Sequence, residues 1–394
     1  MKVLRRIIIS IALLTILYSC REAYTPPAIQ ASVSYLVVDG IINPANDTTT
    51  TIKLSRTVPI NGAMGTKAET GAKVTVESDA NASYILKETS TAGTYTSSAP
   101  LNLSQTGKYR VRIITSGNKT YLSDFVPVKD APPIDTVTYT LPASGLQVFV
   151  SAHDPTNNTR YYRYEYVETW TFHSAFSSSY IATTTRIVPR TPAQDIFTCW
   201  QNANSGDITL ASSANLTQDV VNNTFVASVP AASEKLRIRY SILVKQYALT
   251  KDAYNFWALV KKDTEQLGTI FDAQPSQIQG NIHNVNDSTE PVLGYISTGR
   301  IQQKRIFIDR TDLPAYWGTD DFYKPCYANP NGGPNPHDPV EISKGNYIEL
   351  YFGTYIPLNV SKISSAGDTT FLGAEKQCTD CTLRGFNKKP YFWY

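Results

Sequence analysis

The sequence predicts a mainly β protein. We expect a small Ig-like or transthyretin-like sandwich, then a larger fibronectin-like β-sandwich domain with one main α-helix and a disulfide-stapled, irregular C-terminal tail. Three observations predict this fold class. Thr, Ser, Tyr and Val are frequent, a composition typical of exported β proteins. Apolar residues alternate along short segments that proline and glycine separate. Helical periodicity stands out in a single segment.

The chain begins with the features of a bacterial signal peptide. Residues 1–19 contain three basic residues and then an apolar run, too short for a permanent membrane span of about 20 apolar residues. The run ends in the letters LYSC, which resemble a lipobox, where the cysteine is acylated and becomes the mature N-terminus. We expect acylation of Cys20, with palmitate among the acyl chains, and a polar tether at 20–32. The alternative is an ordinary signal peptide that is cleaved next to a cysteine.

The charge of the chain excludes one class of partner. The full chain has a formal net charge of +3. Residues 1–19 contain three basic residues and no acidic one, so the mature chain has no net charge. Because no positive charge remains to attract phosphate groups, we do not expect nucleic acid as a partner.

Four cysteines remain once Cys20 carries the lipid. They are Cys199, Cys326, Cys378 and Cys381. An even number in an exported protein indicates disulfides, and four cysteines allow three pairings. The CTDC motif at 378–381 has two alternative readings, a redox site at a helix start and a Cys₄ zinc site. A poor helix sequence follows the motif, and an oxidising compartment favours paired thiols, so we expect disulfides, no metal and no cofactor.

Residues 33–127 show the period-2 pattern of half-buried antiparallel strands. The alternating apolar positions are Ile52 and Leu54, Val74 and Val76, and Tyr109, Val111 and Ile113. Gly93 and Gly107 fall where tight turns are needed. The order of these segments looks like a small transthyretin-like or carboxypeptidase-regulatory-like sandwich, and a generic Ig-like sandwich is the alternative.

Prolines mark 126–137 as a linker, and we assign 134–394 to a second, larger domain. Its first two strands are GLQVFVSAHDP and TRYYRYEYVETWTF, joined by a turn at 154–158. The second strand has a tyrosine at every other position and resembles the edge of a fibronectin-type sandwich. From about residue 301 turn residues predominate, and we expect an irregular region there.

One segment, 251–266, has the periodicity of an amphipathic helix. Thr250 can cap its N-terminus. Four apolar or aromatic residues share one face: Ala253, Phe256, Trp257 and Val260. We interpret this face as part of a core, because stripes at helical spacing usually indicate burial, and a ligand-binding role is the alternative.

No familiar catalytic motif occurs in the sequence, such as GxSxG, HExxH, GxGxxG or a P-loop. The four histidines are His153, His173, His283 and His337. Two of them stand in His-Asp-Pro, where Asp-Pro is a common turn starter. Asp320 and Asp321 could bind calcium, but their spacing matches no EF-hand loop, and a surface loop is the better interpretation. We predict no catalytic and no metal-binding residue.

The many aromatic residues allow two interpretations. The 25 tyrosines and five tryptophans could line a glycan or peptide site, because flat amphipathic rings suit such ligands. β-Sandwiches also bury and pair aromatic residues across their strands, and we favour that interpretation.

Several segments point to a known family. They are Cys20 with the Pro-Pro of the tether, YLVVDGIIN, CWQ, RYSILVKQYALTKDAYNFW, GTIFDAQPSQIQGNIHNVNDSTEPVLGYIS and CTDCTLRGFNKKPYFW. Together they resemble the Bacteroidota lipoproteins grouped as domain of unknown function 4249. The resemblance implies an outer-membrane lipoprotein, on the periplasmic or cell-surface face, often encoded near a TonB-dependent receptor. It implies no catalytic residue, and it departs at Arg384-Gly385-Phe386, where Gly-Gly is more common.

Our leading hypothesis is a non-enzymatic binding or accessory subunit. It is anchored to outer-membrane lipid through Cys20 and acts beside a TonB-dependent transporter. One alternative is a surface hydrolase with an unrecognised site, which a pocket with a histidine or paired carboxylates favours. Another is a structural or adhesive surface protein, which sandwich modules without a pocket favour.

Overall fold

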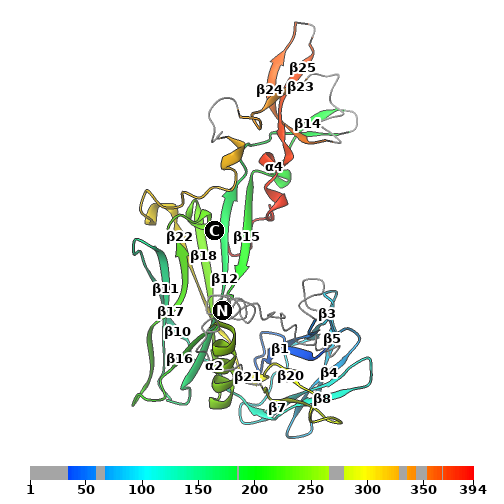
Figure 1. Ribbon diagram of the computed structural model, residues 1–394, viewed down its shortest axis with the longest axis vertical. Helices are drawn as coiled ribbons and strands as arrows, with labels where there is room; N and C mark the ends of the chain where they lie inside the picture. The colour runs from blue at the N-terminus through cyan, green and yellow to red at the C-terminus, as the bar shows by residue number, and fades with distance from the viewer. Residues whose placement is uncertain are drawn as a thin grey trace, which may run out of the picture.

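The computed structural model describes residues 34–58, 67–183, 186–265, 279–327, 335–342, 353–365 and 367–394. The predictions for residues 1–19, Cys20 and the tether at 20–32 lie outside these stretches. Strands make up 47% and helices 11% of the structure, which confirms a mainly β protein with one main helix. Figure 1 shows two β lobes beside each other and an arm that projects from one of them.

The N-terminal lobe is one sheet that curls around a single core. Its strands are β1 Leu36–Ile42, β2 Thr51–Arg56, β3 Lys67–Ala68, β4 Lys73–Ser78, β5 Ser83–Glu88, β6 Thr94–Ser97, β7 Lys108–Ile114, β8 Thr120–Ser123, β9 Val126–Pro127, β19 Ile282–Asn284, β20 Val292–Leu293 and β21 Ser297–Thr298. The main order is β19-β8-β7-β4-β5-β6-β2-β1-β20. Strands at both ends of this order contribute to one buried cluster, so the sheet closes on itself like a sandwich.

Alternation along the strands explains this core, as the sequence predicts. Val74 and Val76 of β4 are fully buried, and the apolar positions of β7 lie beside them in the same cluster. The intervening residues point outward. There, Arg110 and Arg112 of β7 bind Glu77 of β4 at 2.8 and 2.5 Å, an ion-paired cross-strand group on the outer face.

The predicted domain boundaries differ from the structure at one segment. The sequence prediction places 282–298 in the second domain, within 134–394. In the structure this segment returns to the N-terminal lobe, where β20 and β21 pair with β1 in parallel and β19 pairs with β8. Strands of two or three residues carry no readable alternation. Gly294 permits the close approach, because a Cβ there would lie 2.0 Å from the carbonyl oxygen of Val38.

The second lobe is a sandwich of two sheets. Its strands are β10 Ile134–Thr140, β11 Gly145–Asp154, β12 Tyr161–His173, β15 Thr198–Asn204, β16 Thr209–Ser212, β17 Asp219–Pro230, β18 Arg239–Ala248 and β22 Gln302–Asp309. One sheet has the order β10-β11-β17, and the other has β15-β12-β18-β22 with β16 beside β12. Side chains from both sheets share one buried cluster, which forms the core of this lobe.

Two strands of this lobe differ from their predicted places. Strand β12 is central, because β15 and β18 pair with its two sides, whereas the sequence suggests an edge. Tyr162 and Tyr164 of β12 are at most 1% exposed, so the predicted tyrosine face is a core face. Strand β22 pairs with β18 along eight residues, in a region that the sequence predicts to be irregular. The segment shows no alternation of apolar residues because most of its residues are polar, and only Ile308 is fully buried.

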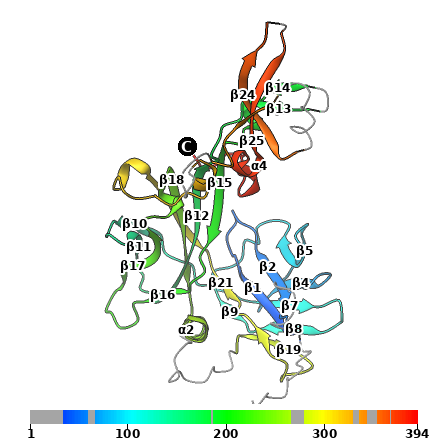
Figure 2. The same ribbon diagram turned by 45° about the horizontal axis from the view of Figure 1, so that its top comes forward.

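The main helix, α2 Lys251–Glu265, confirms the predicted segment. The Thr250 hydroxyl accepts a hydrogen bond from the backbone N–H of Ala253 at 3.2 Å and caps the first turn. Ala253 is fully buried, and the Trp257 ring lies under the Arg163 guanidinium of β12 at 4.0 Å. The aromatic stripe therefore anchors the helix to the second lobe. The second view of the molecule shows this helix at the junction of the two lobes (Figure 2).

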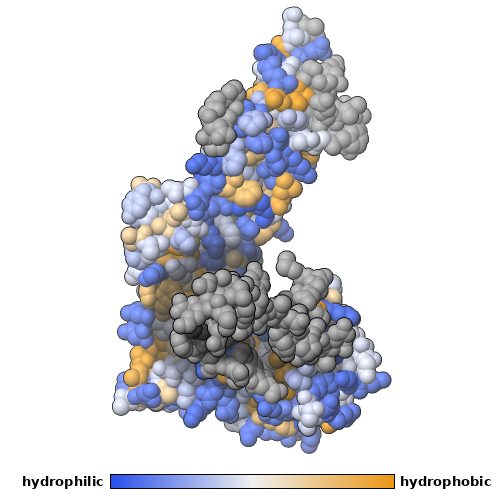
Figure 3. All heavy atoms as spheres, viewed as in Figure 1, coloured by the Kyte–Doolittle hydropathy of each residue, from blue (hydrophilic) through white to orange (hydrophobic). Residues whose placement is uncertain are grey.

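Among the described residues, the arm contains two small sheets. They are formed by β13 Tyr180–Ala182 with β14 Ile187–Pro189, and by β23 Val340–Ile342, β25 Thr369–Glu375 and β24 Tyr355–Ile363. Short helices lie at its base or in the second lobe: η1 Pro192–Gln194, η2 Glu234–Leu236, η3 Arg310–Asp312, η4 Lys324–Cys326, α4 Lys376–Thr379 and η6 Cys381–Leu383. Figure 3 shows apolar side chains gathered on the arm among polar ones. Within the described stretches, no helix is both long and apolar enough to cross a membrane.

Candidate functional site

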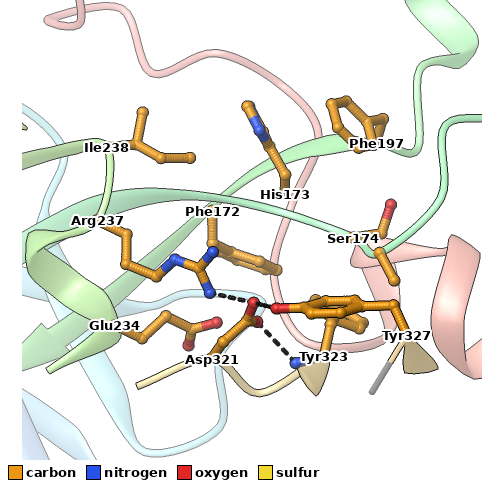
Figure 4. A pocket seen from close by; sticks show the side chains of 11 residues that line it. Phe172, His173, Ser174, Phe197, Glu234, Arg237, Ile238, Asp321, Tyr323 and Tyr327 are labelled. Atoms are coloured by element: carbon orange, nitrogen blue, oxygen red, sulfur yellow. Dashed lines mark hydrogen bonds and ion pairs between the residues drawn. The ribbon is translucent and has the colours of Figure 1, made fainter. Parts of the chain in front are cut away.

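A recess of about 320 Å³ lies where β12 and β15 leave the second lobe for the arm. Its lining residues are Phe172, His173, Ser174, Ala175, Phe197, Glu234, Arg237, Ile238, Asp321, Tyr323 and Tyr327 (Figure 4). They come from the end of β12, the approach to β15, the turn between η2 and β18, and the loop around η4. The recess is therefore assembled from segments that lie far apart in the sequence.

Asp321 is the polar centre of one wall. It forms an ion pair with Arg237, accepts a hydrogen bond from the Tyr327 hydroxyl, and accepts another from the backbone N–H of Tyr323 at 2.9 Å. Burial alone raises the pKa of the Asp321 carboxyl, but these donors outweigh it and lower that pKa below its ordinary value. Asp321 is thus a charged group whose oxygens accept from donors on η2–β18 and on the loop around η4.

Glu234 is the second carboxylate of the recess. The Arg384 guanidinium donates to both of its oxygens, at 3.0 and 2.6 Å. The same guanidinium lies over the rings of Phe172 at 4.8 Å and Phe322 at 3.8 Å. Both members of the ion pair are less than one-fifth exposed. The C-terminal segment therefore holds the lining residue Glu234 in place through Arg384.

His173 lies at the opposite side of the recess from Tyr327 (Figure 4). Its ring stacks on Phe197, with 4.4 Å between the ring centroids. Partial burial lowers the pKa of His173, and the positive charge of Arg237 lowers it further, while Asp195 opposes the shift. The His173 side chain is therefore mainly neutral at pH 7.

Two disulfides fix the walls of the recess. Cys199 is bonded to Cys381, and Cys326 is bonded to Cys378. Cys326 belongs to η4, whereas Cys199 lies in β15, two residues after Phe197, so the CTDC motif is bonded to both walls of the recess. All four residues are at most 7% exposed. The predicted disulfides are confirmed, and neither the zinc nor the redox reading fits cysteines that are already paired.

Backbone hydrogen bonds reinforce this double staple. The N–H of Cys381 donates to the carbonyl of Ile196 at 2.9 Å, and the N–H of Ala175 donates to the carbonyl of Cys378 at 3.0 Å. The CTDC segment thus pairs with both strand ends that border the recess. The sequence shows the cysteines but not their pairing, because partners 52 and 182 residues apart meet only in the folded chain.

The other histidines lie outside the recess. Asp154, next to His153, accepts from three backbone N–H groups and one hydroxyl in the following turn, as its turn-starter interpretation predicts. His283 contacts Asp124 at 3.2 Å on the N-terminal lobe. His337 contacts Glu375 at 2.7 Å, and Cys378 lies close to this pair. This group does not form a metal site, because Cys378 is bonded to another cysteine and offers no thiolate.

Four of the five tryptophans are core residues, whereas the described tyrosines occupy both buried and exposed positions. Trp170, Trp200, Trp317 and Trp393 are at most 8% exposed, in agreement with burial. The residues that sequence reasoning missed are Glu234, Arg237 and Tyr327. None of the three belongs to a motif. Glu234 and Arg237 each form an ion pair with a residue more than 80 positions away in the sequence. Tyr327 follows Cys326, whose disulfide holds the loop beside the recess.

One protein family matches most of the chain. A family described as Domain of unknown function (DUF4249) matches residues 21–305. The chain belongs to the DUF4249 family. The matched range includes β12, η2 and β18 but ends before the η4 loop and the CTDC motif. In this DUF4249 protein, the Cys199–Cys381 disulfide therefore joins the matched range to the residues after it. The Cys326–Cys378 disulfide lies entirely within those later residues.

Other comparisons add little to the family. No curated protein matches the DUF4249 chain. Among solved structures, the adhesin InvE of Yersinia pseudotuberculosis is 14% identical, with a TM-score of 0.15, over 55% of this chain and 55% of the adhesin. The chain thus spans about half the length of that adhesin, and a TM-score this low supports no statement about fold or function.

Proposed function

We propose that this DUF4249 protein is a non-enzymatic lipoprotein of the outer membrane that binds a small ligand beside a TonB-dependent transporter. The LYSC sequence supports an acyl anchor on Cys20, because it follows a short apolar run. The observation that carries the binding role is the recess, whose walls are held rigid by two disulfides and two ion pairs. A preformed recess of this kind loses little freedom when a ligand enters it.

The arm supports the role of an accessory subunit. It projects from the second lobe and exposes Val340, Val360 and Ile363, by 42%, 36% and 69% of their surface. Exposed apolar residues that gather on a projecting element are typical of protein contact sites. We assign the contact with the transporter to this arm.

Co-purification tests the proposed function. The tagged full chain is extracted with detergent from outer membranes, and its partners are identified by mass spectrometry, with labelled palmitate to report acylation. We expect a TonB-dependent transporter with the wild type, and loss of both label and membrane fraction with Cys20→Ala. Ile363→Asp should release the transporter, whereas Ile85→Asp, a 60% exposed site on the N-terminal lobe, should retain it. Repeated recovery of the lipoprotein without any transporter contradicts the proposal.

A surface hydrolase is the second candidate, and His173 in the recess favours it. The chemistry of the neighbouring groups is less suitable. The Ser174 hydroxyl donates to the carbonyls of Phe176 and Ile196, at 3.1 and 3.5 Å, so it is not aligned with His173 as a nucleophile. Both carboxylates are engaged by arginines. Hydrolysis of ester, peptide or glycoside substrates that His173→Ala abolishes would establish this candidate instead.

A further inference from the structure

We propose that the recess binds one sugar ring of a neutral oligosaccharide. This inference rests on the proposed binding function and names its ligand class. The recess has about 320 Å³, which is at the lower end of the roughly 300–1,000 Å³ typical of small-molecule sites. A ligand of this size has to match three properties of the lining: its charge, its hydrogen-bonding groups and its aromatic surface.

Each charged residue that lines the recess has an ion-pair partner. Asp321 is paired with Arg237 and Glu234 with Arg384, so two negative and two positive groups offset each other. The lowered pKa of His173 keeps that side chain neutral near pH 7. A ligand with a net charge would leave water for a site without an unpaired counter-charge, which is costly. This pairing therefore favours a neutral ligand.

The lining of the recess offers both hydrogen-bond donors and hydrogen-bond acceptors. Arg237 uses one terminal nitrogen for Asp321, and its side chain is 36% exposed, so further N–H donors are available. The ring of His173 forms no hydrogen bond with any described residue, and the neutral ring has one donor and one acceptor. Glu234 and Asp321 contribute carboxylate oxygens. Sugar hydroxyls donate and accept at once, so they match such a mixed lining.

The aromatic surface supplies the third property. Tyr327 is 49% exposed, and its ring lies along one side of the recess, across from His173 and Phe197 (Figure 4). The hydroxyl of Tyr327 is fixed by Asp321, so the ring is held in one orientation. A sugar ring presents C–H groups on one face and hydroxyls at its edge. It can therefore stack on Tyr327 while its edge reaches Arg237 and Glu234.

Titration of the full acylated chain with defined trisaccharides tests this inference. Lauryl dimethylamine oxide serves as the detergent, because it contains no sugar. The neutral probes are maltotriose, cellotriose and tri-N-acetylchitotriose, the charged probe is trigalacturonic acid, and the peptide probe is trialanine amide. Binding is measured by calorimetry and by saturation-transfer NMR. We expect saturable binding of at least one neutral trisaccharide, and no saturable binding of the acidic trisaccharide or the peptide.

Matched variants locate the binding site. Tyr327→Ala should weaken binding about three- to tenfold, the effect of losing one aromatic contact. Tyr327→Phe keeps the ring and should weaken it less. Tyr316→Ala removes a 69% exposed ring outside the recess and should leave affinity unchanged. Circular dichroism and mass spectrometry of the two disulfides verify that each variant is folded.

Three results would overturn the inference. They are no saturable binding of any neutral trisaccharide, tighter binding of trigalacturonic acid or trialanine amide, and equal affinity of wild type and Tyr327→Ala. The proposed function is judged separately by co-purification of the transporter. If the transporter is recovered and no trisaccharide binds, the ligand class is wrong and the accessory role remains.

Discussion

The N-terminal lobe and the region around the recess are stabilised in different ways. The lobe has a core of alternating apolar side chains, and its described residues contain no cysteine. The recess region depends on two disulfides, on Arg237 with Asp321, and on Arg384 with Glu234. The difference teaches that cross-links and ion pairs can hold polar groups around a surface recess at the edge of an apolar core.

Removing both disulfides together should give the largest effect. Replacing Cys199 and Cys381 by alanine, or Cys326 and Cys378, should lower the free energy of unfolding of the second lobe by about 2–4 kcal/mol per bond. The reason is that each bond closes a long loop, of 182 or 52 residues in sequence separation. Urea unfolding with limited proteolysis measures this. The N-terminal lobe should resist protease in every variant, and its simultaneous loss would show that the two regions are not independent.

A core substitution tests the N-terminal lobe. Ile52→Ala removes a fully buried side chain of β2 and should destabilise the N-terminal lobe by about 2–5 kcal/mol, because a cavity remains. Ile85→Ala on β5, which is 60% exposed, serves as the control and should cost less than about 0.5 kcal/mol. Urea unfolding measures both. An equal loss of stability in the two variants would contradict the assignment of the core.

The ion pair beside the recess should have a smaller effect. Arg384→Ala leaves Glu234 without its partner and should lower stability by about 1–3 kcal/mol. The control is Lys362→Ala, which removes an exposed partner of Glu341 on the arm and should cost less than about 1 kcal/mol. Thermal unfolding distinguishes the two. If Arg384→Lys retains full stability, the bidentate geometry is not what matters.

The smallest effect is the pH dependence of His173. Because the pKa of His173 is lower in the folded protein than its ordinary value of 6.5, the unfolded chain binds the proton first. Stability should therefore fall as pH drops below about 6.5 and through the folded pKa, and His173→Gln should remove that part of the slope. NMR titration of the ring should give a pKa below 6.5 that rises in Arg237→Gln. An unshifted pKa would place His173 outside the influence of burial and Arg237.

The sequence predicts individual strands and the main helix, because their patterns depend on residues close together in the chain. Alternation identifies β4 and β7, because Val74, Val76 and Val111 each point to a core that lies beside their own strand. Thr250 and the stripe after it identify α2. The short strands at 282–298 and the central position of β12 are not predictable in this way, because both depend on which strand lies beside them.

The candidate site lies mostly beyond what the sequence determines. By itself, the sequence determined the β class, the helix, the expectation of an exported chain with paired cysteines, and the family resemblance. Only the tertiary structure decided which cysteines are paired and that Glu234, Arg237, His173 and Tyr327 face one recess. Periodicity reports which side of an element is buried, because burial depends on nearest neighbours along that element. A polar site depends on contacts between distant segments, and no local pattern encodes them.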